Sequence, residues 1–421
     1  MSSRPQIRGA TQEELEEIVR LNAEVFSEYQ QRRKYFELAI SYDPYHRPEF
    51  NRIAIVDGKI VSNVRIVHRR MRIGSSLVLM GGIADVSTLV PYRRRGLATA
   101  LLKDALNYMR EHGYVVSLLF TGIAPFYRRL GWEIVLHNIS ISGDVLSLAK
   151  RLEDFMDSRN IPKYEIRKFE ENDLESVARV YDEDNRSRTC TIERTLEYWR
   201  LRLKGSFELG FESPEGFLVA LKDDSVVAYI RSKLNENTCS ILEACSLRGF
   251  EGAYVYLLRR LLKLCIERRI SSVRALLPED HPMTWLLIEL GAYLSKSRSG
   301  AMLKVVDLVS LFRALADELL ARTKKSGLVS QKKTLAIETD IGVCSLRISE
   351  SEIEVLEEKA SSPDGVLKVD QRVLAQLITG FRDVRTAVGY GDAIVHPYEA
   401  IKLFDALFPP GNPYFWRFDS F

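Results

Sequence analysis

The chain has 421 residues, more than one ordinary hydrophobic core accommodates, so about two to four domains are expected. Its apolar fraction of 46% is typical of a globular protein and excludes a disordered one. Sixty basic and 57 acidic residues leave a net charge of +3, which gives no argument for nucleic-acid binding.

Signals for membranes, secretion and metals are also missing. No apolar run approaches the roughly 18 residues that cross a bilayer, and residues 1–15 lack the apolar centre of a signal peptide. The five cysteines are scattered and the six histidines form no H-E-x-x-H pattern, so neither disulfides nor zinc are indicated. We expect a cytoplasmic protein that binds no membrane, nucleic acid or metal.

Helix and strand patterns alternate along the first part of the chain. Residues 11–27 open with a capping box, Thr11 and Glu14, and carry an apolar stripe typical of an amphipathic helix. Residues 51–73 indicate strands around an Asp57-Gly58 turn, and residues 81–90 indicate another strand.

The alternation continues to residue 131. A helix is predicted from Gly96 to His112, with Gly113 as its stop signal. Residues 114–120 are typical of a buried strand, and Pro125 opens a short helix that ends at Gly131. Together these elements predict an α/β domain.

The pattern then begins again, which indicates a duplication. Ile166-Arg167 repeats Ile7-Arg8 at an offset of 159, and Leu290-Gly291 repeats Leu130-Gly131 at an offset of 160. The second copy's first helix is expected to follow Asn172, with Glu175 at the capping-box position.

A different pattern follows from about residue 310. Residues 332–358 give short alternating strands, Asp370 caps a predicted helix, and another helix is expected over Tyr398–Phe408. This arrangement predicts a third domain of the α+β type.

Chemistry is concentrated in the stretch VSTLVPYRRRGLATALL, which joins a predicted strand to a predicted helix. Its core is Arg93-x-x-Gly96-x-Ala98. The free N–H groups at a helix start and its positive dipole end attract anions, and a residue without a side chain lets a diphosphate approach the backbone. The alternative is a charged turn with a glycine cap, but the strand before and the amphipathic helix after it favour the anion site.

This stretch resembles the acetyl-CoA motif of the GNAT acetyltransferases, and the whole chain resembles the enhanced intracellular survival (Eis) family. The resemblance implies an α/β (α+β) protein with tandem GNAT (acyl-CoA N-acyltransferase) domains followed by a sterol-carrier-protein-2-like α+β domain. The expected boundaries are 1–155 for the catalytic GNAT domain, 156–305 for a degenerate second one, and 306–421 for the third. It also implies a hexamer.

The resemblance assigns roles to individual residues. Tyr127 would be the general acid, and the carboxylate of the terminal residue Phe421 the general base. Val90 departs from the family, where many members have proline, so the loop shape near it is open. The residues implied to bind acetyl-CoA are Val86, Ser87, Thr88, Arg93, Arg94, Arg95, Gly96, Leu97, Ala98, Thr99, Gly122 and Ile123.

Both catalytic roles are consistent with the chemistry. Tyrosine and thiol pKa values, about 10 and about 8.5, are close enough for Tyr127 to protonate the leaving thiolate. An α-carboxylate at about 3.5 is a poor base for an ammonium at about 10 unless an apolar setting shifts both pKa values. The aromatic segment NPYFWRFDSF is expected to dock the terminus on the first domain and dry this carboxylate. The alternatives are that Tyr127 only packs and that these aromatics only seal a domain interface.

The second copy is expected to be structural, because Arg248, Gly252 and Ala253 make R-x-x-x-G-A, one residue too long for the motif. On the substrate side, the resemblance implies Phe26 and Glu28 as pocket residues. Asp419, two residues from the end, is a further candidate charge because of its position. Glu28 as a solvated carboxylate is an equally good interpretation.

Acetyl transfer to primary amines, including aminoglycosides or other polyamines, is the leading hypothesis. A protein lysine or N-terminal acetyltransferase, and a non-catalytic protein that binds acetyl-CoA or a lipid, are the alternatives.

Overall fold

The computed structural model describes residues 4–26, 32–327 and 332–421, and two compact units organise them. The first unit comprises residues 1–136, 299–413 and 421, and the second comprises residues 137–298 and 414–420. The chain therefore enters the second unit within one strand, leaves it within another, and returns to it for most of its last residues. The three predicted domain boundaries stay a prediction.

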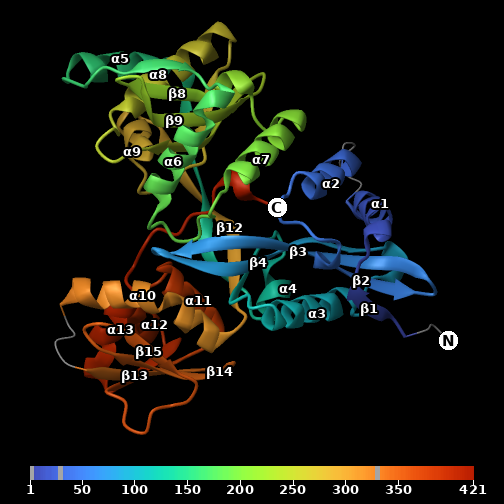
Figure 1. Ribbon diagram of the computed structural model, residues 1–421. Helices are drawn as coiled ribbons and strands as arrows, with labels where there is room; N and C mark the ends of the chain where they lie inside the picture. The colour runs from blue at the N-terminus through green and yellow to red at the C-terminus, as the bar shows by residue number, and fades with distance from the viewer. Residues whose placement is uncertain (1–3, 27–31, 328–331) are drawn as a thin grey trace. The chain divides into compact units, whose positions relative to one another are not determined.

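The larger sheet of the first unit has the strand order β1, β2, β3, β4, β5 and the last part of β12. Strands β4 and β5 are parallel, and the other neighbours are antiparallel. Helices α1 and α3 cover opposite faces of this sheet (Figure 1). The bounds are β1 Gln6–Gly9, α1 Leu15–Val25, α2 Arg32–Ser41, β2 Asn51–Val56, β3 Lys59–Ile73, β4 Ser76–Thr88, α3 Leu97–Glu111, β5 Val116–Phe120, α4 Ala124–Arg128 and β12 Tyr293–Val305.

Local signals in the sequence account for these elements. The Thr11 N–H donates to the Glu14 carboxylate at 2.8 Å, so the predicted capping box is confirmed. Asp57 and Gly58 both adopt positive φ, as a tight hairpin turn requires. The apolar stripes of α1 and α3 are buried in one hydrophobic core with strands β2 to β5. The fold of this region is thus the α/β arrangement that the sequence predicts.

A second, smaller sheet also belongs to the first unit, with the order β15, β14, β13, β16, β17. Its helices gather over one face of the sheet (Figure 1), which gives the expected α+β arrangement. Asp370 caps α11 as predicted, because its carboxylate accepts from the Arg372 N–H at 2.8 Å. The bounds are α10 Leu308–Ser326, β13 Lys333–Thr339, β14 Gly342–Ile348, β15 Ile353–Leu356, β16 Gly365–Val369, α11 Gln371–Thr379, α12 Val384–Gly389, β17 Ala393–His396 and α13 Ile401–Leu407.

The second unit repeats the plan of a sheet with covering helices. Its strands lie in the order β6, β11, β10, β9, β8, β7, of which β10 and β11 are parallel. The bounds are β6 Glu133–Asp144, α5 Val145–Asp157, β7 Glu165–Lys168, α6 Leu174–Asn185, α7 Leu196–Glu208, β8 Leu218–Lys222, β9 Ser225–Leu234, β10 Thr238–Ser246, α8 Ala253–Glu267, β11 Ser272–Ala275 and α9 Pro282–Glu289.

Matching turns support the internal duplication. Gly131 and Gly291 have φ of 96° and 89°, and each lies between a helix and a strand. One detail of the sequence interpretation is wrong: the second capping box is formed by Glu170 and Asp173, not by residues 172 and 175. Asp173 also pairs with Arg167, just as Glu14 pairs with Arg8 of β1. This ion pair favours the capping box that lies two residues before the predicted one.

In the part of the chain that the structure describes, no helix has the length and apolar character to cross a membrane.

Candidate active site

The site begins where β4 and β5 separate. Their parallel pairing ends with Ile83 opposite Leu119, while β4 continues beyond. Ser87 turns its backbone toward β3, where its carbonyl accepts a hydrogen bond of 2.6 Å from Ser62. Because successive residues of a strand direct their backbone groups to opposite sides, the backbone of Val86 faces the side that β5 has left. An extended ligand can pair with the strand there.

A β-bulge lies in β4 just before that point. The register between β3 and β4 shifts between Asn63 and Arg65, and Asp85 adopts a left-handed φ of 52°. Arg65 holds the Asp85 carboxylate at 2.5 Å, and their side chains are only 2% and 8% exposed. This nearly buried ion pair fixes the bend by which β4 leaves its neighbour.

The loop before α3 has the geometry of an anion-binding helix start. Arg94 and Gly96 have left-handed φ values of 62° and 79°, and no side chain caps the helix at Gly96. A Cβ atom on Gly96 would meet no other atom within 4 Å, so the space over the backbone is open. Open space, left-handed backbone and uncapped N–H groups together suit a phosphate group.

The first turn of α3 offers its backbone rather than its side chains. The first helical hydrogen bond runs from the Ala100 N–H to the Gly96 carbonyl, at 2.9 Å. The N–H groups of Leu97, Ala98 and Thr99 precede that bond. The Leu97 side chain is buried in the core, and the other two are partly buried.

The three arginines of this loop are exposed, and two of them have fixed neighbours. The Arg93 Nε donates to the Thr88 carbonyl at 3.1 Å. The Arg95 guanidinium lies 5.2 Å from the centre of the Tyr92 ring. They add positive charge beside the helix start, which strengthens its attraction for an anion.

Exposed apolar side chains lie at the two loops that follow β4 and β5. Val90 is 68% exposed in a short 3-10 turn that includes Pro91, and Ile123 is 62% exposed after β5. Gly122, next to Ile123, has open space where a Cβ would stand. Exposed apolar groups beside an anion site suit a ligand with both an apolar arm and phosphates.

Tyr127 lies in α4 and is 7% exposed. Its ring packs edge-on against Phe126 and Trp132, with centres 5.0 and 6.2 Å away. Burial raises the pKa of the Tyr127 hydroxyl to about 12. The Tyr127 ring therefore packs in the core, which does not decide between the acid role and packing alone, so the acid role stays a prediction.

The ring of Phe421 lies on the same part of the sheet. The centre of the Phe421 ring is 5.6 Å from that of Phe120, the last residue of β5. A Cβ on Gly82 would lie 2.3 Å from the Cζ atom of Phe421. Gly82 immediately precedes the last β4 residue that pairs with β5. The terminal ring thus packs where the two strands separate, and the glycine leaves it room.

Comparison with known families bears directly on this region. Residues 6–135 match the acetyltransferase (GNAT) domain. This domain identifies the protein as an acyltransferase enzyme. It includes the β4–β5 separation, the arginine loop and Tyr127, so these features belong to the matched region. Among the curated proteins, none matches this chain in sequence.

Solved structures extend the likeness in fold to the whole chain. A probable N-acyltransferase of unknown function from Enterococcus faecalis has 17% identity and a TM-score of 0.79, and all of both chains is covered. A GCN5-related N-acetyltransferase from Anabaena variabilis has 17% identity and a TM-score of 0.76, with 99% of this chain and 100% of that chain covered. Eis1 from Mycobacterium abscessus has 18% identity and a TM-score of 0.71, with the same coverage. At this identity they show the fold, so the expected GNAT-like α/β fold is confirmed.

The aromatic C-terminal segment is anchored in the second unit, apart from Phe421. The Trp416 Nε1 donates to Asn185 at 2.7 Å, and the Tyr414 hydroxyl donates to the Leu276 carbonyl at 2.7 Å. We expected this segment to dock the terminus on the first domain; only Phe421 belongs to the first unit, and residues 414–420 belong to the second. The side chains of Tyr414, Phe415, Trp416 and Phe418 are buried, whereas Arg417 is exposed.

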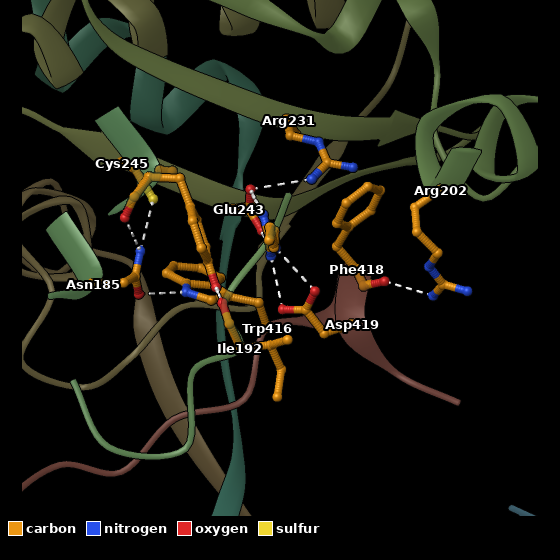
Figure 2. Close-up of polar contacts among 12 residues, drawn as sticks. Asn185, Ile192, Arg202, Arg231, Glu243, Cys245, Trp416, Phe418 and Asp419 are labelled. Carbon is orange, nitrogen blue, oxygen red and sulfur yellow. Dashed lines mark hydrogen bonds and ion pairs between the residues drawn. The ribbon is translucent and has the colours of Figure 1, made fainter. Parts of the chain in front are cut away.

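Asp419 forms part of a buried ion network in the second unit. Its carboxylate accepts two hydrogen bonds of 2.9 Å from Arg194, which also donates to Glu243 at 3.0 and 2.6 Å. Figure 2 shows these carboxylates together, with Arg231 reaching Glu243 from another strand. Asp419 is fully buried, so the expectation that it adds charge to a substrate pocket is wrong.

The network predicts a pH-dependent contribution to stability. Burial alone would raise the pKa of Glu243, but Arg194 and Arg231 hold it at about 2. For Glu243→Gln we expect the free energy of unfolding to fall by about 2 kcal/mol at pH 7, because each arginine keeps one other carboxylate. Because the pKa of Glu243 is lowered in the folded protein, its carboxylate contributes its full stabilisation above pH 4.5, the ordinary pKa. This stabilisation is lost as the pH falls through about 2, so the difference between the wild type and the variant shrinks in acid.

Urea unfolding of both proteins at pH 7 and pH 3 measures this effect. Glu153→Gln is the matched control, because Glu153 pairs with Arg259 on the surface of the same unit and both side chains are about half exposed. Such a pair contributes about 0.5 kcal/mol. Equal losses for the two variants would contradict the assigned importance of the buried network.

The second unit does not reproduce the anion-binding loop. Gly252, which precedes α8, has an ordinary φ of −58°, and a Cβ there would meet Ile161 at 3.4 Å. At Gly96 the corresponding space is open. This contrast agrees with the structural role expected of the second copy.

The two predicted substrate residues have different outcomes. Phe26 follows the last residue of α1, and the centre of its ring lies 5.8 Å from that of Phe36. The Phe26 side chain therefore packs within the GNAT domain. Glu28 lies outside the described residues.

No group of three or more His, Cys, Asp or Glu side chains among the described residues is arranged to hold a metal ion.

Two features of the site were missed by sequence reasoning. Gly82 has no motif around it, and only the Phe421 ring explains why a side chain is excluded there. The Arg65–Asp85 pair joins two strands at positions 20 residues apart, and no local spacing indicates it. Both depend on tertiary contacts, so a single sequence carries no signal for them.

Proposed function

We propose that the protein transfers the acetyl group of acetyl-CoA to a primary amine, with an aminoglycoside or another polyamine as the acceptor class. The observation that carries this proposal is the open loop at Gly96, beside the separation of β4 and β5, inside the region that matches a GNAT domain. The diphosphate would lie on the N–H groups at the start of α3, and the pantetheine arm along Val86 and Thr88.

Two groups would move protons in this reaction. The carboxylate of Phe421 takes a proton from the acceptor ammonium, and the neutral amine attacks the thioester carbonyl carbon. As the carbonyl re-forms, the C–S bond breaks, and the Tyr127 hydroxyl protonates the departing sulfur. The excess proton on the attacking nitrogen replaces the one that Tyr127 gave up, so the products are the neutral amide and the CoA thiol. The position of the Phe421 ring beside the end of β5 supports this assignment. A dry site raises the pKa of the thiolate along with that of the tyrosine, which keeps proton transfer between them favourable.

The finer family assignment belongs to the same proposal. The likeness in fold to Eis1 from Mycobacterium abscessus over 99% of this chain supports an Eis-type organisation. In that organisation residues 306–421 are a sterol-carrier-like domain, the chains assemble as hexamers, and the protein acts in the cytoplasm. The five-stranded sheet of residues 333–396, with helices over one face, is consistent with a sterol-carrier-like domain.

A thiol-release assay tests the function. The purified protein is mixed with acetyl-CoA and a panel of aminoglycosides, polyamines and lysine peptides, and free CoA is measured over time. We expect release to depend on a small polyamine or aminoglycoside. Release only with lysine peptides would favour a protein acetyltransferase. Tight acetyl-CoA binding without release to any acceptor would favour a non-catalytic binding protein.

A further inference from the structure

A separate cavity of about 590 Å³ lies within the first unit. The C-terminal half of α3, the segment after α4, β12 and the start of α11 form its walls. Six basic side chains and two acidic ones line it, which gives a formal net charge of +4. The basic residues are Lys103, Arg110, Arg128, Arg129, Lys304 and Arg372.

The acidic side chains of the cavity are already engaged. Asp340 accepts from the backbone and the side-chain N–H groups of Gln371, at 2.7 and 3.0 Å. Asp370 pairs with Arg372 at 2.9 Å, and Arg128 pairs with Glu133 at 2.6 Å.

Four cations stay without a carboxylate at ion-pair distance among the described residues. They are Lys103, Arg110, Arg129 and Lys304.

Lys304 is the most unusual of these cations, because it is only 8% exposed. Its Nζ donates to the side-chain oxygen of Gln371 at 2.7 Å and lies 5.8 Å from the centre of the Trp132 ring. Burial lowers the pKa of Lys304 to about 8. The Lys304 ammonium bonds a neutral amide and has no carboxylate at ion-pair distance among the described residues. Asp340 and Asp370 attract it from farther away, but its pKa is still lowered, so they offset only part of the lost hydration. An anion in the cavity would offset more of it.

The cavity is distinct from the loop proposed to hold the diphosphate of acetyl-CoA. Gly96 precedes the first residue of α3, whereas Arg110 is the penultimate residue of that helix. At 1.5 Å per residue, Arg110 lies roughly 20 Å from Gly96 along the helix, and Lys103, the nearest α3 residue of the lining, roughly 10 Å. The cavity is therefore lined by other residues than those of the loop.

We propose that this cavity binds a small molecule carrying two or more linked phosphate groups, independently of acetyl-CoA. Its volume falls in the range of sites for small molecules, roughly 300–1,000 Å³. The four cations without carboxylate partners come from α3, from the segment after α4 and from β12, so they can contact several phosphates of one ligand. A single phosphate would leave part of this charge without a partner.

Calorimetric titration with inorganic triphosphate, in the presence of saturating CoA, tests the proposal. The CoA occupies its own site, so the triphosphate reports on the cavity alone. For the full chain we expect one triphosphate per chain and an affinity that falls with salt. Lys304→Met keeps the side-chain length and should weaken binding at least tenfold. Arg110→Gln, on the exposed surface of α3, should weaken it several-fold and serves if the buried substitution impairs folding.

Lys402→Gln is the matched control, since it removes one positive charge from an exposed position of α13 in the same unit. It should leave triphosphate binding unchanged. The proposal is overturned if triphosphate fails to bind once CoA is saturating. It is equally overturned if the two cavity variants bind triphosphate as tightly as the control does.

Discussion

Extending the chain by a few residues after Phe421 is expected to lower kcat by roughly 10²- to 10⁴-fold, the usual contribution of a positioned base. The extension converts the terminal carboxylate into an amide, which cannot accept the proton of the acceptor ammonium. The Phe421 ring still has its place against Phe120 and Gly82. The affinity for acetyl-CoA should therefore change little. Thiol release at saturating acetyl-CoA and acceptor, together with CoA titration, separates the two quantities.

Two further variants make this result specific. Phe421→Leu keeps the terminal carboxylate and a smaller apolar side chain, so it should retain far more activity than the extended chain. Gly82→Ala places a methyl group within 2.3 Å of the terminal ring and should displace it, which predicts a loss of kcat without any change at the terminus. Wild-type turnover in the extended chain would remove the carboxylate from the mechanism.

Tyr127→Phe is expected to lower kcat by about 10²- to 10⁴-fold, with the affinity for acetyl-CoA within a factor of about two. The substitution keeps the ring that packs against Phe126 and Trp132, so the fold should be preserved. Only the proton that reaches the leaving sulfur is lost. Steady-state kinetics and CoA titration of the two proteins measure the difference.

The pH dependence adds a second test of the same role. Burial raises the pKa of Tyr127 to about 12, so the hydroxyl keeps its proton throughout the range in which the protein can be assayed. The kcat of the wild type should therefore show no decline near pH 10 from this group. Tyr390→Phe, which removes an exposed hydroxyl in the same unit, is the control and should leave kcat unchanged. A Tyr127→Phe variant with wild-type kcat would reduce this residue to packing.

Local patterns were good predictors of the elements that frame the site. The capping box at Thr11 and the glycine before α3 both lie where the sequence indicates, because such signals act within one turn of backbone. The second capping box was placed two residues too late. Two pairs of residues, Glu170 with Asp173 and Asn172 with Glu175, have the spacing of a capping box. The ion pair between Arg167 and Asp173 favours the first of them. The same six-residue spacing joins Arg8 to Glu14, and the repeat offset of 159 leads from Glu14 to Asp173, so the repeat carried the signal that the capping-box pattern alone did not.

The C-terminal segment shows more clearly what local patterns in the sequence cannot predict. Its aromatic residues predict burial, and Trp416 is indeed fully buried. The sequence does not say which core receives them. The partner of Asp419 is Arg194, 225 positions earlier in the chain. A contact over that separation is formed by folding of the second unit, so Asp419 became a buried anchor instead of a substrate residue.

The amino-acid sequence by itself determined the α/β character of the chain, its internal repeat, and the loop from Arg93 to Ala98, because periodicity and glycine placement act over short distances. Only the tertiary structure decided where the terminal ring packs, which buried charges meet, and that unpaired cations gather around Lys304. Those outcomes depend on burial, and burial is a property of the folded chain as a whole.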